Sequence, residues 1–472
     1  WFQLFFSWKT SIVEIMKHLF DSTIIRSYDI RGIYQQTLDK NDARALGHLL
    51  AISLEKNKVV NIGYDGRFSS IPLKNELISG LVEGGAVVND IGLGPTPMLY
   101  YSCYLNNSEM GVMVTGSHNP SNHNGFKIVK NNRPLFGKNL KNLAEKGIDY
   151  ELGQVSGSSH LYKVKEKYTQ KLISYLTKKR KLNICWDSGN GAAGEVMSYI
   201  SKKVLGKHIL LFDDIDGNFP NHHPDPSDPK NLQDIIECVK ENSLDIGIAF
   251  DGDGDRIGVV DDKGRVVPGD ILLLVFAKDL LEKEKNCSVI GDVKCSKILF
   301  DYIKKNGGRP IMAKTGHSHI KECIKENDAV LAGEMSGHIF FADNYFGYDD
   351  ALYAAVRLIN ILSKSEKKLS DIIDEFPKSY NTPEIRIECD DKEKFKIIDK
   401  VIKNQKNKKY SDIDGIRVEL DNGWWLMRAS NTQAAMVLRC EANSKKDLDE
   451  IISIVKNEIK KISPELSKQI LA

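Results

Sequence analysis

The clearest indication of the fold is the segment Leu244-Asp-Ile-Gly-Ile-Ala-Phe250, followed by Asp251-Gly-Asp-Gly-Asp-Arg256 and then by Ile257-Gly-Val-Val260. The two outer segments are short, apolar and rich in β-branched residues, which predicts buried strands. The loop between them places three carboxylates at alternate positions among glycines, which relax the backbone so that the acids can converge. An apolar strand that ends in such a loop indicates an α/β fold whose strand ends carry the chemistry.

The three aspartates of this loop, Asp251, Asp253 and Asp255, indicate a site for a divalent cation. Like charges about 4 Å apart repel by about 4 kcal/mol at an effective dielectric of 20, and a cation removes that penalty. Ligation by carboxylate oxygens favours Mg²⁺ or Ca²⁺ over softer metals. A calcium EF-hand loop also begins D-x-D-x-D, but it needs Gly and Glu where this chain has Arg256 and Asp262. A solvated acidic turn is the alternative without function.

Short apolar runs alternate with helical patterns along the whole chain, which is typical of α/β architecture with mostly parallel strands. Further predicted strands cover Val59–Tyr64, Gly111–Thr115 and Leu182–Asp187. The 472 residues are too many for one hydrophobic core, so we expect three or four domains. Three consecutive α/β units of similar size would fit a repeated domain.

Polar, turn-forming stretches mark the expected domain limits: Gly153–Ser159, Asp261–Gly264 and Phe376–Pro383. The chain opens without Met, and the segment from Met16 resembles a natural start, so residues 1–16 are expected to be an extension that is not native. We expect three mixed α/β domains and a smaller C-terminal α+β domain around a central cleft. Their expected limits are 17–160, 161–262, 263–376 and 377–472.

Composition excludes several classes of partner. The 66 Lys+Arg and 64 Asp+Glu give a formal net charge of +2, which predicts neither nucleic acid nor a membrane surface as partner. No run approaches the roughly 20 apolar residues that a membrane-spanning helix needs. The 8 cysteines are scattered without a C-x-x-C pair or zinc spacing, which suits reduced thiols in a cytoplasmic protein.

A second motif, Thr115-Gly-Ser-His-Asn-Pro120, also follows a predicted strand and continues to Asn124-Gly-Phe-Lys127. A serine between Gly116 and His118 at a strand end is suited to act as a nucleophile or a phosphate carrier. The alternative is a turn whose polar side chains bond only to the local backbone. The motif is not a nucleophile elbow, because G-x-S-x-G is absent.

Together these motifs resemble the α-D-phosphohexomutase superfamily, from about residue 24 to residue 442. Four landmarks occur in the family's order: the serine loop Thr115–Pro120, the metal loop Asp251–Arg256, the sugar loop Gly333-Glu-Met-Ser-Gly-His338 and the phosphate loop Arg428-Ala-Ser-Asn-Thr432. Met335 in the sugar loop is typical of the bacterial phosphomannomutase/phosphoglucomutase branch, whereas the phosphoglucosamine branch has Gln there.

The resemblance implies a mechanism. Ser117 carries a phosphoryl group, gives it to a mannose or glucose monophosphate and takes back the other phosphate of the resulting 1,6-bisphosphate. Hexose 1-phosphate and hexose 6-phosphate are thereby interconverted. Mg²⁺ is implied as a cofactor, held by Asp251, Asp253, Asp255 and a phosphoserine oxygen on Ser117. The implied partners are small sugar phosphates, and the chain is expected to be a monomer or a homodimer.

The resemblance also assigns other residues. Catalytic contacts are expected at Arg31, His118, Lys127 and His317, and a phosphate contact at Arg256. Substrate-binding residues are expected at Tyr28, Lys294, Glu334, Ser336, His338, Arg428, Ser430, Asn431 and Thr432. The identity of the general base stays open. Glu334 and Ser336 would bind O3 and O4, which glucose and mannose share, so the sugar loop would accept both sugars.

Competing functions remain at this stage. Gly189-Asn-Gly-Ala-Ala-Gly194 matches the G-x-G-x-x-G pattern of dinucleotide-binding dehydrogenases, although a lone match is weak. A metal-dependent phosphatase would use the same serine and metal but transfer the group to water. A phosphoglucosamine mutase and a binding module without catalysis are further alternatives. For a mutase we expect the C-terminal domain to open by a hinge near Pro377–Pro383.

Overall fold

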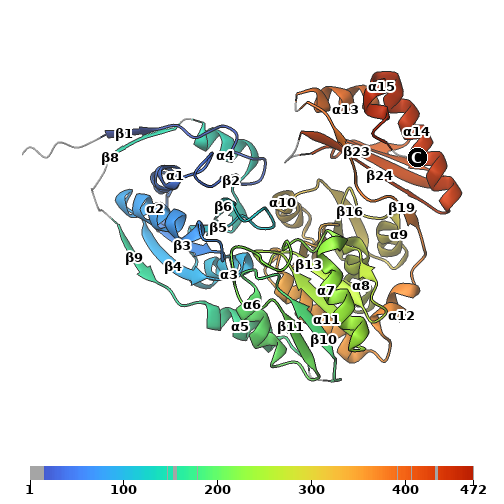
Figure 1. Ribbon diagram of the computed structural model, residues 1–472, viewed down its shortest axis with the longest axis horizontal. Helices are drawn as coiled ribbons and strands as arrows, with labels where there is room; N and C mark the ends of the chain where they lie inside the picture. Colours follow the sequence, from blue (N-terminus) through green and yellow to red (C-terminus); the bar gives the residue numbers. More distant parts are fainter. Residues whose placement is uncertain are drawn as a thin grey trace, which may run out of the picture.

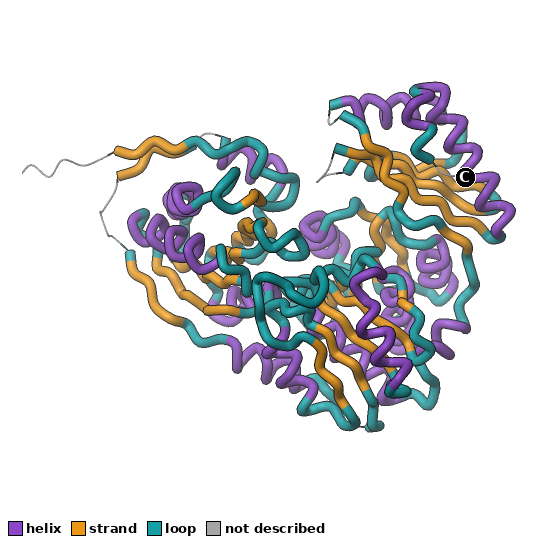
Figure 2. Tube along the Cα trace, viewed as in Figure 1, coloured by secondary structure: helices purple, strands orange, loops and turns teal. Residues whose placement is uncertain are grey.

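The structure is a computed structural model that describes residues 15–145, 147–151, 157–177, 179–390, 392–405, 407–430 and 434–470. Figure 1 shows four units in chain order, three built of strands and helices in alternation and a C-terminal unit with a sheet covered by helices. Figure 2 shows strands between helices in the first three units and helices along one side of the sheet in the C-terminal unit.

The first unit contains a seven-stranded sheet in the order β2-β6-β5-β3-β4-β9, with β7 beside β6. Its strands are β2 (Ile30–Ile33), β3 (Val59–Tyr64), β4 (Val87–Leu93), β5 (Met110–Val114), β6 (His123–Lys130), β7 (Arg133–Pro134) and β9 (Ser158–Leu161). Its helices are α1 (Lys40–Ile52), α2 (Ser70–Glu83), α3 (Thr96–Asn106) and α4 (Gly137–Ala144). A separate antiparallel pair joins β1 (Ile15–His18) to β8 (Ile148–Glu151).

The second unit contains a five-stranded sheet in the order β11-β10-β12-β13-β14. Its strands are β10 (Ile184–Asp187), β11 (His208–Leu211), β12 (Ile246–Phe250), β13 (Ile257–Asp261) and β14 (Val266–Val267). Its helices are α5 (Lys165–Ser174), α6 (Gly194–Ser201), the 3₁₀ turn η1 (Pro229–Leu232) and α7 (Gln233–Glu241).

The third unit contains a four-stranded sheet in the order β16-β15-β17-β18. Its strands are β15 (Ser288–Asp292), β16 (Arg309–Ala313), β17 (Leu331–Gly333) and β18 (Ile339–Phe341). Its helices are α8 (Gly269–Lys283), α9 (Lys297–Lys305), α10 (His317–Asn327), α11 (Ala351–Lys364) and α12 (Leu369–Asp374).

The C-terminal unit has a six-stranded sheet in the order β19-β24-β23-β22-β21, with β20 also beside β24, and its pairings are antiparallel. Its strands are β19 (Tyr380–Asn381), β20 (Ile385–Glu388), β21 (Tyr410–Ser411), β22 (Ile416–Leu420), β23 (Gly423–Ala429) and β24 (Ala435–Ala442). Its helices are α13 (Glu393–Asn404), α14 (Lys445–Ile462) and α15 (Pro464–Ser467). The predicted fold class, three mixed α/β domains and a smaller α+β domain, is confirmed.

The first three units share one strand order. In each unit, four strands lie in the order β4-β3-β5-β6, β11-β10-β12-β13 or β16-β15-β17-β18. Of these four, the strand that comes first in the chain is parallel to the second and third and lies between them. The fourth strand is antiparallel to the third and lies beside it. The connection from third to fourth strand, here called the corner loop, carries the serine loop, the metal loop and the sugar loop respectively. The chain therefore uses one topological position three times.

The expected domain limits stay predictions. Residues 1–14 lie outside the described residues, but Ile15 and Met16 pair with Glu151 and Tyr150. A regular strand therefore begins inside the segment 1–16 that we expected to be an extension, because its backbone bonds to the end of the first unit. Likewise Val266–Val267 pairs with β13, so the second sheet continues past residue 262.

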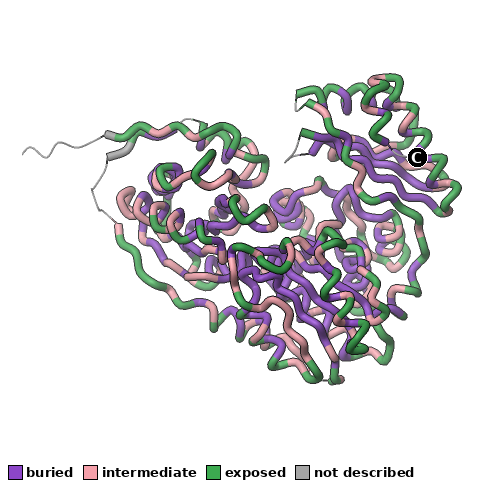
Figure 3. The backbone as a smooth tube through the Cα atoms, viewed as in Figure 1, coloured by how far each residue is buried: buried purple, intermediate pink, exposed green. Residues whose placement is uncertain are grey.

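The largest hydrophobic cluster unites the second and third units and includes α3 of the first. Trp186, Phe250 and Phe276 are fully buried there, and Figure 3 shows the central sheets as the most continuously buried part of the molecule. The corner loops are therefore connected to strands that are held in a packed hydrophobic core. None of the helices within the described residues is both long and apolar enough to cross a membrane.

The C-terminal unit is joined to the third unit by buried polar groups. Arg417 donates to the backbone carbonyls of Val293 and Cys295 at 2.9 and 2.7 Å, and its guanidinium lies 3.7 Å from the ring centroid of Trp424. Glu441 accepts from the Ser296 hydroxyl at 2.9 Å. Arg417 also donates to Glu419, and Glu441 also accepts from Trp424, so each group bonds both within its own unit and across to the third unit.

Candidate active site

The serine loop and the metal loop meet where β5 and β12 end. Ser117 is buried, and its Oγ lies 2.9 Å from Oδ2 of Asp251. Ser117 has φ of 50°, a left-handed conformation that a non-glycine residue rarely adopts. A Cβ on Gly252 would lie 2.4 Å from the Ser117 carbonyl oxygen, so only glycine allows this approach. The predicted meeting of the serine with the acidic loop is therefore found.

The three aspartates of the metal loop are fully buried and lie close enough to hold one ion. Their nearest carboxylate oxygens are within 4.8 Å of one another. Among the described atoms, Oδ1 of Asp253 and Oδ1 of Asp255 have no hydrogen-bond partner. Buried carboxylate oxygens without partners are costly, and a hard cation satisfies them. The donor set thus fits a divalent cation that prefers oxygen.

Lys127 stands against the same loop. Its Nζ lies 2.7 Å from Oδ2 of Asp253 and also contacts Oδ2 of Asp255. Burial opposes the charge on Lys127, but these two carboxylates outweigh it and raise the pKa of the ammonium above its ordinary value. The lysine is therefore charged and points at the place where the two loops meet.

Two residues that the motifs did not reveal hold the serine loop. Arg67 is almost fully buried and donates to four backbone carbonyls of the loop region, those of Ser117, Asn119, Pro120 and His123. Asp65 accepts from Thr115 Oγ1 at 2.7 Å and from the Gly116 amide at 3.1 Å, and it pairs with Arg67. The sequence signal was Asp-Gly-Arg directly after the strand Val59–Tyr64.

The sugar loop brings Glu334 and His338 to the other side of the site. Glu334 accepts from the Gly316 amide at 2.6 Å, and burial raises the pKa of Glu334 above its ordinary value. Arg256 Nε lies 3.0 Å from Nε2 of His338. Ser336 is partly exposed in the same loop. The three corner loops therefore converge, with Arg256 bridging two of them.

An aspartate that sequence reasoning missed lies behind the sugar loop. Asp349 is fully buried, with Oδ2 at 3.2 Å from Nδ1 of His338 and 3.4 Å from Nδ1 of His317. Lys321 Nζ lies 2.7 Å from its Oδ1. Asp349 could also ligate an ion with Asp255 and His338, because one ligand atom of each lies within 4.8 Å of the others. No motif surrounds Asp349 in the sequence, so only the fold identifies it.

The two histidines predicted as catalytic contacts are neutral at physiological pH. His118 has Nδ1 at 3.2 Å from Ser117 Oγ, and burial, together with Arg256 and Arg31, lowers the pKa of His118 well below its ordinary value. His317 stacks on His338 with ring centroids 5.4 Å apart. Burial and the nearby Lys321 lower the pKa of His317 to about 4. Neutral imidazoles can accept a proton.

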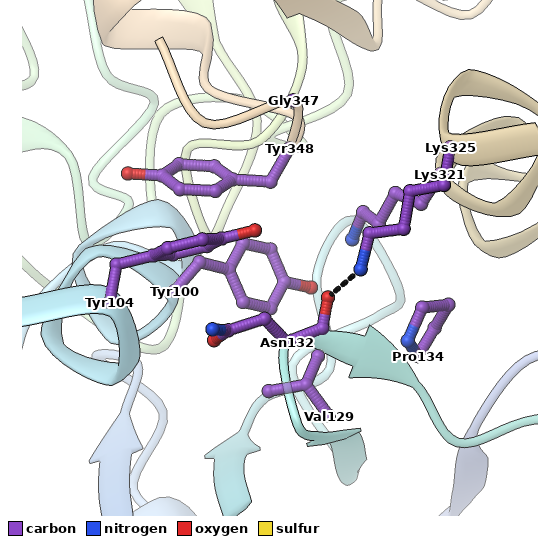
Figure 4. A pocket seen from close by; sticks show the side chains of 9 residues that line it. All are labelled: Tyr100, Tyr104, Val129, Asn132, Pro134, Lys321, Lys325, Gly347 and Tyr348. Carbon is purple, nitrogen blue, oxygen red and sulfur yellow. Dashed lines mark hydrogen bonds between the residues drawn. The ribbon is translucent and has the colours of Figure 1, made fainter. Parts of the chain in front are cut away.

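A small pocket lies beside this histidine cluster, between the first and third units (Figure 4). Its volume of about 20 Å³ is the scale of one water molecule. Lys321 lies over the ring of Tyr100, 4.1 Å from its centroid, and Lys325 donates to the Asn132 carbonyl. The pocket is too small for a sugar phosphate.

Tyr28 and Arg31 reach the site from the first unit. The Tyr28 hydroxyl donates to the Thr315 carbonyl at 2.8 Å, which links the first unit to the third. Arg31 donates to Asp29 and to Oδ1 of Asn119 at 2.9 Å, so it borders the serine loop.

Lys294 and Arg428 are held by acids rather than by the metal loop. Lys294 Nζ lies 2.8 Å from Glu384, and Arg428 Nε lies 2.8 Å from Asp414. Asp414 also accepts from the Thr315 amide at 3.2 Å, which joins the phosphate loop to the third unit. Ser430 is buried. Asn431 and Thr432, the other predicted phosphate ligands, lie outside the described residues.

The G-x-G-x-x-G segment supports the metal loop instead of forming an open cofactor turn. The Ala192 amide donates to the Gly252 carbonyl at 2.9 Å. A Cβ on Gly191 would lie 3.0 Å from that same carbonyl oxygen, and one on Gly194 would lie 2.1 Å from the Asp213 carbonyl oxygen. The glycines of this segment therefore let protein backbone pack closely against the metal loop and against Asp213.

Four family models match the chain in order. They are described as phosphoglucomutase/phosphomannomutase alpha/beta/alpha domains I, II and III and the C-terminal domain, at residues 22–151, 165–264, 268–380 and 384–457. A phosphomannomutase/phosphoglucomutase of Pseudomonas syringae pv. tomato is 44% identical over 448 residues, 94% of this chain and 96% of that one. A phosphoglucomutase of Neisseria gonorrhoeae is 39% identical, covering 91% and 95%. The crystal structure of a phosphoglucomutase/phosphomannomutase family protein from Burkholderia thailandensis matches with a TM-score of 0.88 at 37% identity, covering 94% and 99%.

Proposed function

The chain belongs to the phosphoglucomutase/phosphomannomutase family and is a phosphohexomutase, and from that premise we propose that it interconverts the 1- and 6-phosphates of glucose and mannose through a phosphoserine at Ser117. The observation that carries the role of Ser117 is the 2.9 Å distance between its Oγ and the buried carboxylate of Asp251. A serine used only as a turn residue would have no reason to face three buried acids.

In the proposed cycle the phosphoryl group starts on Ser117 Oγ. The free hydroxyl of a hexose monophosphate attacks the phosphorus, the bond to Oγ breaks, and a 1,6-bisphosphate forms. After the intermediate has turned, Ser117 Oγ attacks the other phosphate and the bond from that phosphorus to the sugar oxygen breaks. The transition state is loose, so alignment and nearby positive charge supply most of the catalysis.

Positive side chains of this chain would stabilise the transferring group. Lys127 and Arg256 are buried or nearly so on either side of the metal loop, where little water screens their charge. We assign them to the equatorial phosphoryl oxygens. His118, His317 and His338 surround the same place, and one of them accepts the proton of the attacking hydroxyl. Of these, His118 is within 3.2 Å of the serine oxygen.

We propose Mg²⁺ as the cofactor, held by Asp251, Asp253 and Asp255 with an oxygen of the phosphorylated serine. When bound, it supplies positive charge that favours transfer. The unpartnered buried oxygens on two of these acids support this choice, and the cluster found among the described residues consists of carboxylates alone, which disfavours softer ions.

Glu334 and Ser336 are proposed to bind the 3- and 4-hydroxyls of the sugar, with Arg428, Ser430, Asn431 and Thr432 on the phosphate distal to Ser117. Glucose and mannose differ only at C2, so binding at O3 and O4 alone would accept both. The 8 cysteines are scattered without paired spacing, which suits reduced thiols, and we place the enzyme in a reducing, cytoplasmic setting.

Coupled assays test the function. Glucose 1-phosphate, mannose 1-phosphate and glucosamine 1-phosphate are supplied to wild type and to Ser117→Ala with Mg²⁺ and a trace of bisphosphate. We expect the glucose and mannose phosphates to be isomerised by wild type, and Ser117→Ala to lose at least ~10⁴-fold in turnover because the phosphate carrier is gone. Circular dichroism checks that the variant is folded.

Two outcomes would contradict this function. Accumulation of inorganic phosphate in place of the isomerised sugar would identify a phosphatase. Fastest turnover of glucosamine 1-phosphate would assign the chain to the phosphoglucosamine branch.

A further inference from the structure

A pocket of about 380 Å³ opens between the N-terminal segment of the first unit and helix α13 of the C-terminal unit. Its lining residues are Ser22, Thr23, Ile25, Arg26, Ser27, Lys394, Phe395 and Ser430. Among these described residues there are two cations and four hydroxyl groups and no carboxylate, although the neighbouring Asp21 accepts from the Thr23 hydroxyl at 2.7 Å. A phosphate dianion is bound by this combination of cations and hydroxyl donors.

Both walls of the pocket lead directly into the active site. On one wall Ser27 precedes Tyr28, whose hydroxyl donates to the Thr315 carbonyl. On the other wall Ser430 directly follows strand β23, which carries Arg428, whose partner Asp414 accepts from the Thr315 amide. The pocket is therefore the outer neighbour of the proposed phosphate loop and is distinct from the metal loop.

The two cations differ in burial. Lys394 is only 4% exposed, and its Nζ donates to the Ser430 carbonyl at 2.6 Å. Its charge thus stands at the edge of the phosphate loop, where screening by water is weak. Arg26, on the opposite wall, is exposed. A ligand in the pocket would therefore contact the buried ammonium of Lys394 on one side and the exposed guanidinium of Arg26 on the other.

We propose that this pocket is an outer anion subsite, which holds one phosphate of the 1,6-bisphosphate while the intermediate turns between the two transfers. The inference rests on the proposed mutase function. An intermediate that must leave the phosphate loop to turn is lost if nothing else holds it. A second cationic site beside the first keeps its effective concentration high, because release from one site is followed by capture at the next.

Arg26→Gln tests the subsite, since it removes one charge from an exposed side chain and should leave the fold intact. With glucose 1-phosphate as substrate, the reaction is quenched and free glucose 1,6-bisphosphate is separated by anion-exchange chromatography. We expect the bisphosphate released per mole of product to rise roughly fivefold, the effect of losing one partly screened charged contact. Turnover should then also depend on added bisphosphate.

Lys56→Gln is the matched control, because it removes the same charge from an exposed residue of the first unit outside the pocket. It should release as little bisphosphate as wild type. Lys394→Arg keeps the buried charge and should resemble wild type, whereas Lys394→Gln should resemble Arg26→Gln. Thermal unfolding shows whether each variant is folded, and if Lys394→Gln is not, the pair Arg26→Gln and Lys56→Gln decides.

Equal release from Arg26→Gln and Lys56→Gln, with the wild-type mutase reaction intact, would overturn the subsite alone. A wild type that forms no hexose 6-phosphate would instead overturn the proposed function. The two failures are thus separate.

Discussion

The serine loop and the metal loop leave the third strand of two units with the same strand order, but different groups hold them in place. The carbonyls of the serine loop are bound by the guanidinium of Arg67, which comes from the end of a neighbouring strand. The metal loop folds around its own side chain, because Asp251 accepts the amides of Asp255 and Arg256 at 3.0 and 3.1 Å. The shared strand order therefore sets where each corner loop lies in its unit. The groups that bond to the loop backbone determine which of its side chains stay available for chemistry.

The serine loop is supported from outside, which leaves its own side chains available for chemistry. The metal loop uses one oxygen of Asp251 for structure and leaves Oδ1 of Asp253 and Oδ1 of Asp255 for a ligand, while the Oδ2 atoms of these two acids contact Lys127. Substitutions in the metal loop should therefore affect turnover more than stability, and substitutions of the support of the serine loop should affect both.

The largest effect is expected for Asp251→Asn. The amide oxygen can still accept the two backbone amides, so the loop should keep its shape. Burial and the charges of Asp255 and Asp253 raise the pKa of Asp251 well above its ordinary value, so loss of the charge should leave the melting temperature unchanged or higher. Turnover of glucose 1-phosphate should fall by ~10³-fold or more. Coupled assay and scanning calorimetry measure both quantities.

Asp234→Asn is the control for this loss of charge, since Asp234 is exposed on α7. Retention of more than about a tenth of wild-type turnover in Asp251→Asn would show that transfer does not need this carboxylate.

Arg67→Lys should mainly change stability. Lysine keeps the charge but lacks the planar fork that reaches several carbonyls at once. Removing the guanidinium leaves buried carbonyls and the Asp65 carboxylate without full partners, which should lower the free energy of unfolding by about 3 kcal/mol. Urea denaturation measures this, with the exposed Arg386→Lys as control. Equal unfolding free energies in the two variants would rule out guanidinium support of the serine loop.

His317, which stacks on His338 of the third corner loop, extends the comparison to pH. The pKa of His317 is lowered from 6.5 to about 4, so the folded state keeps this imidazole neutral while the unfolded state takes up a proton below pH 6.5. Stability is therefore lost as the pH falls from 6.5 towards 4. Between pH 7 and pH 5 this group should cost about 2 kcal/mol. Denaturant unfolding of wild type and His317→Gln at both pH values measures the difference.

His118 also has a lowered pKa and should leave part of the pH dependence in the His317→Gln variant. Identical slopes with pH in the two proteins would mean that His317 is protonated equally in the folded and unfolded chain.

The smallest effect is expected for Gly252→Ala, which changes only the approach of the two loops. The new methyl group would lie 2.4 Å from the Ser117 carbonyl oxygen and should separate serine and acids slightly. Turnover should fall about tenfold, because transfer depends on alignment. Gly63→Ala is the control, since its methyl would meet only side-chain atoms of Ile91 and Met113 at 3.1 Å or more. Unequal stability but equal activity in these variants would show that the spacing of the loops is not critical.

Much of the fold followed from the sequence because strand ends and loops have clear local signals. The strands predicted at Val59–Tyr64, Leu182–Asp187 and Leu244–Phe250 are present with small changes at their ends. The glycine-rich acidic loop stood out because its acids are close in sequence. The common strand order of the three units was harder to see, since it depends on pairings between distant segments.

The sequence did not identify residues whose role depends on distant partners. Arg67 contacts a loop fifty residues away, and Asp349 meets His338 only through the fold of the third unit. Lys394 was identified only by the hydrogen bond from its Nζ to the carbonyl of Ser430, which is 36 positions along the chain. Apart from the Asp-Gly-Arg triplet that contains Arg67, nothing local distinguishes such residues from ordinary surface charges until the units are assembled.

The buried guanidinium of Arg417 constrains how the C-terminal unit can move relative to the third unit. If that unit swings on the linker at Pro377–Pro383, the contact with Val293 and Cys295 acts as a fulcrum. From Trp424 beside it to Ser430 the strand spans six residues, a lever arm of about 20 Å. A rotation of only ~10° would then carry Ser430 through about 3.5 Å, more than the length of a hydrogen bond. A slight twist at the fulcrum would be enough to make or release the grip on a phosphate.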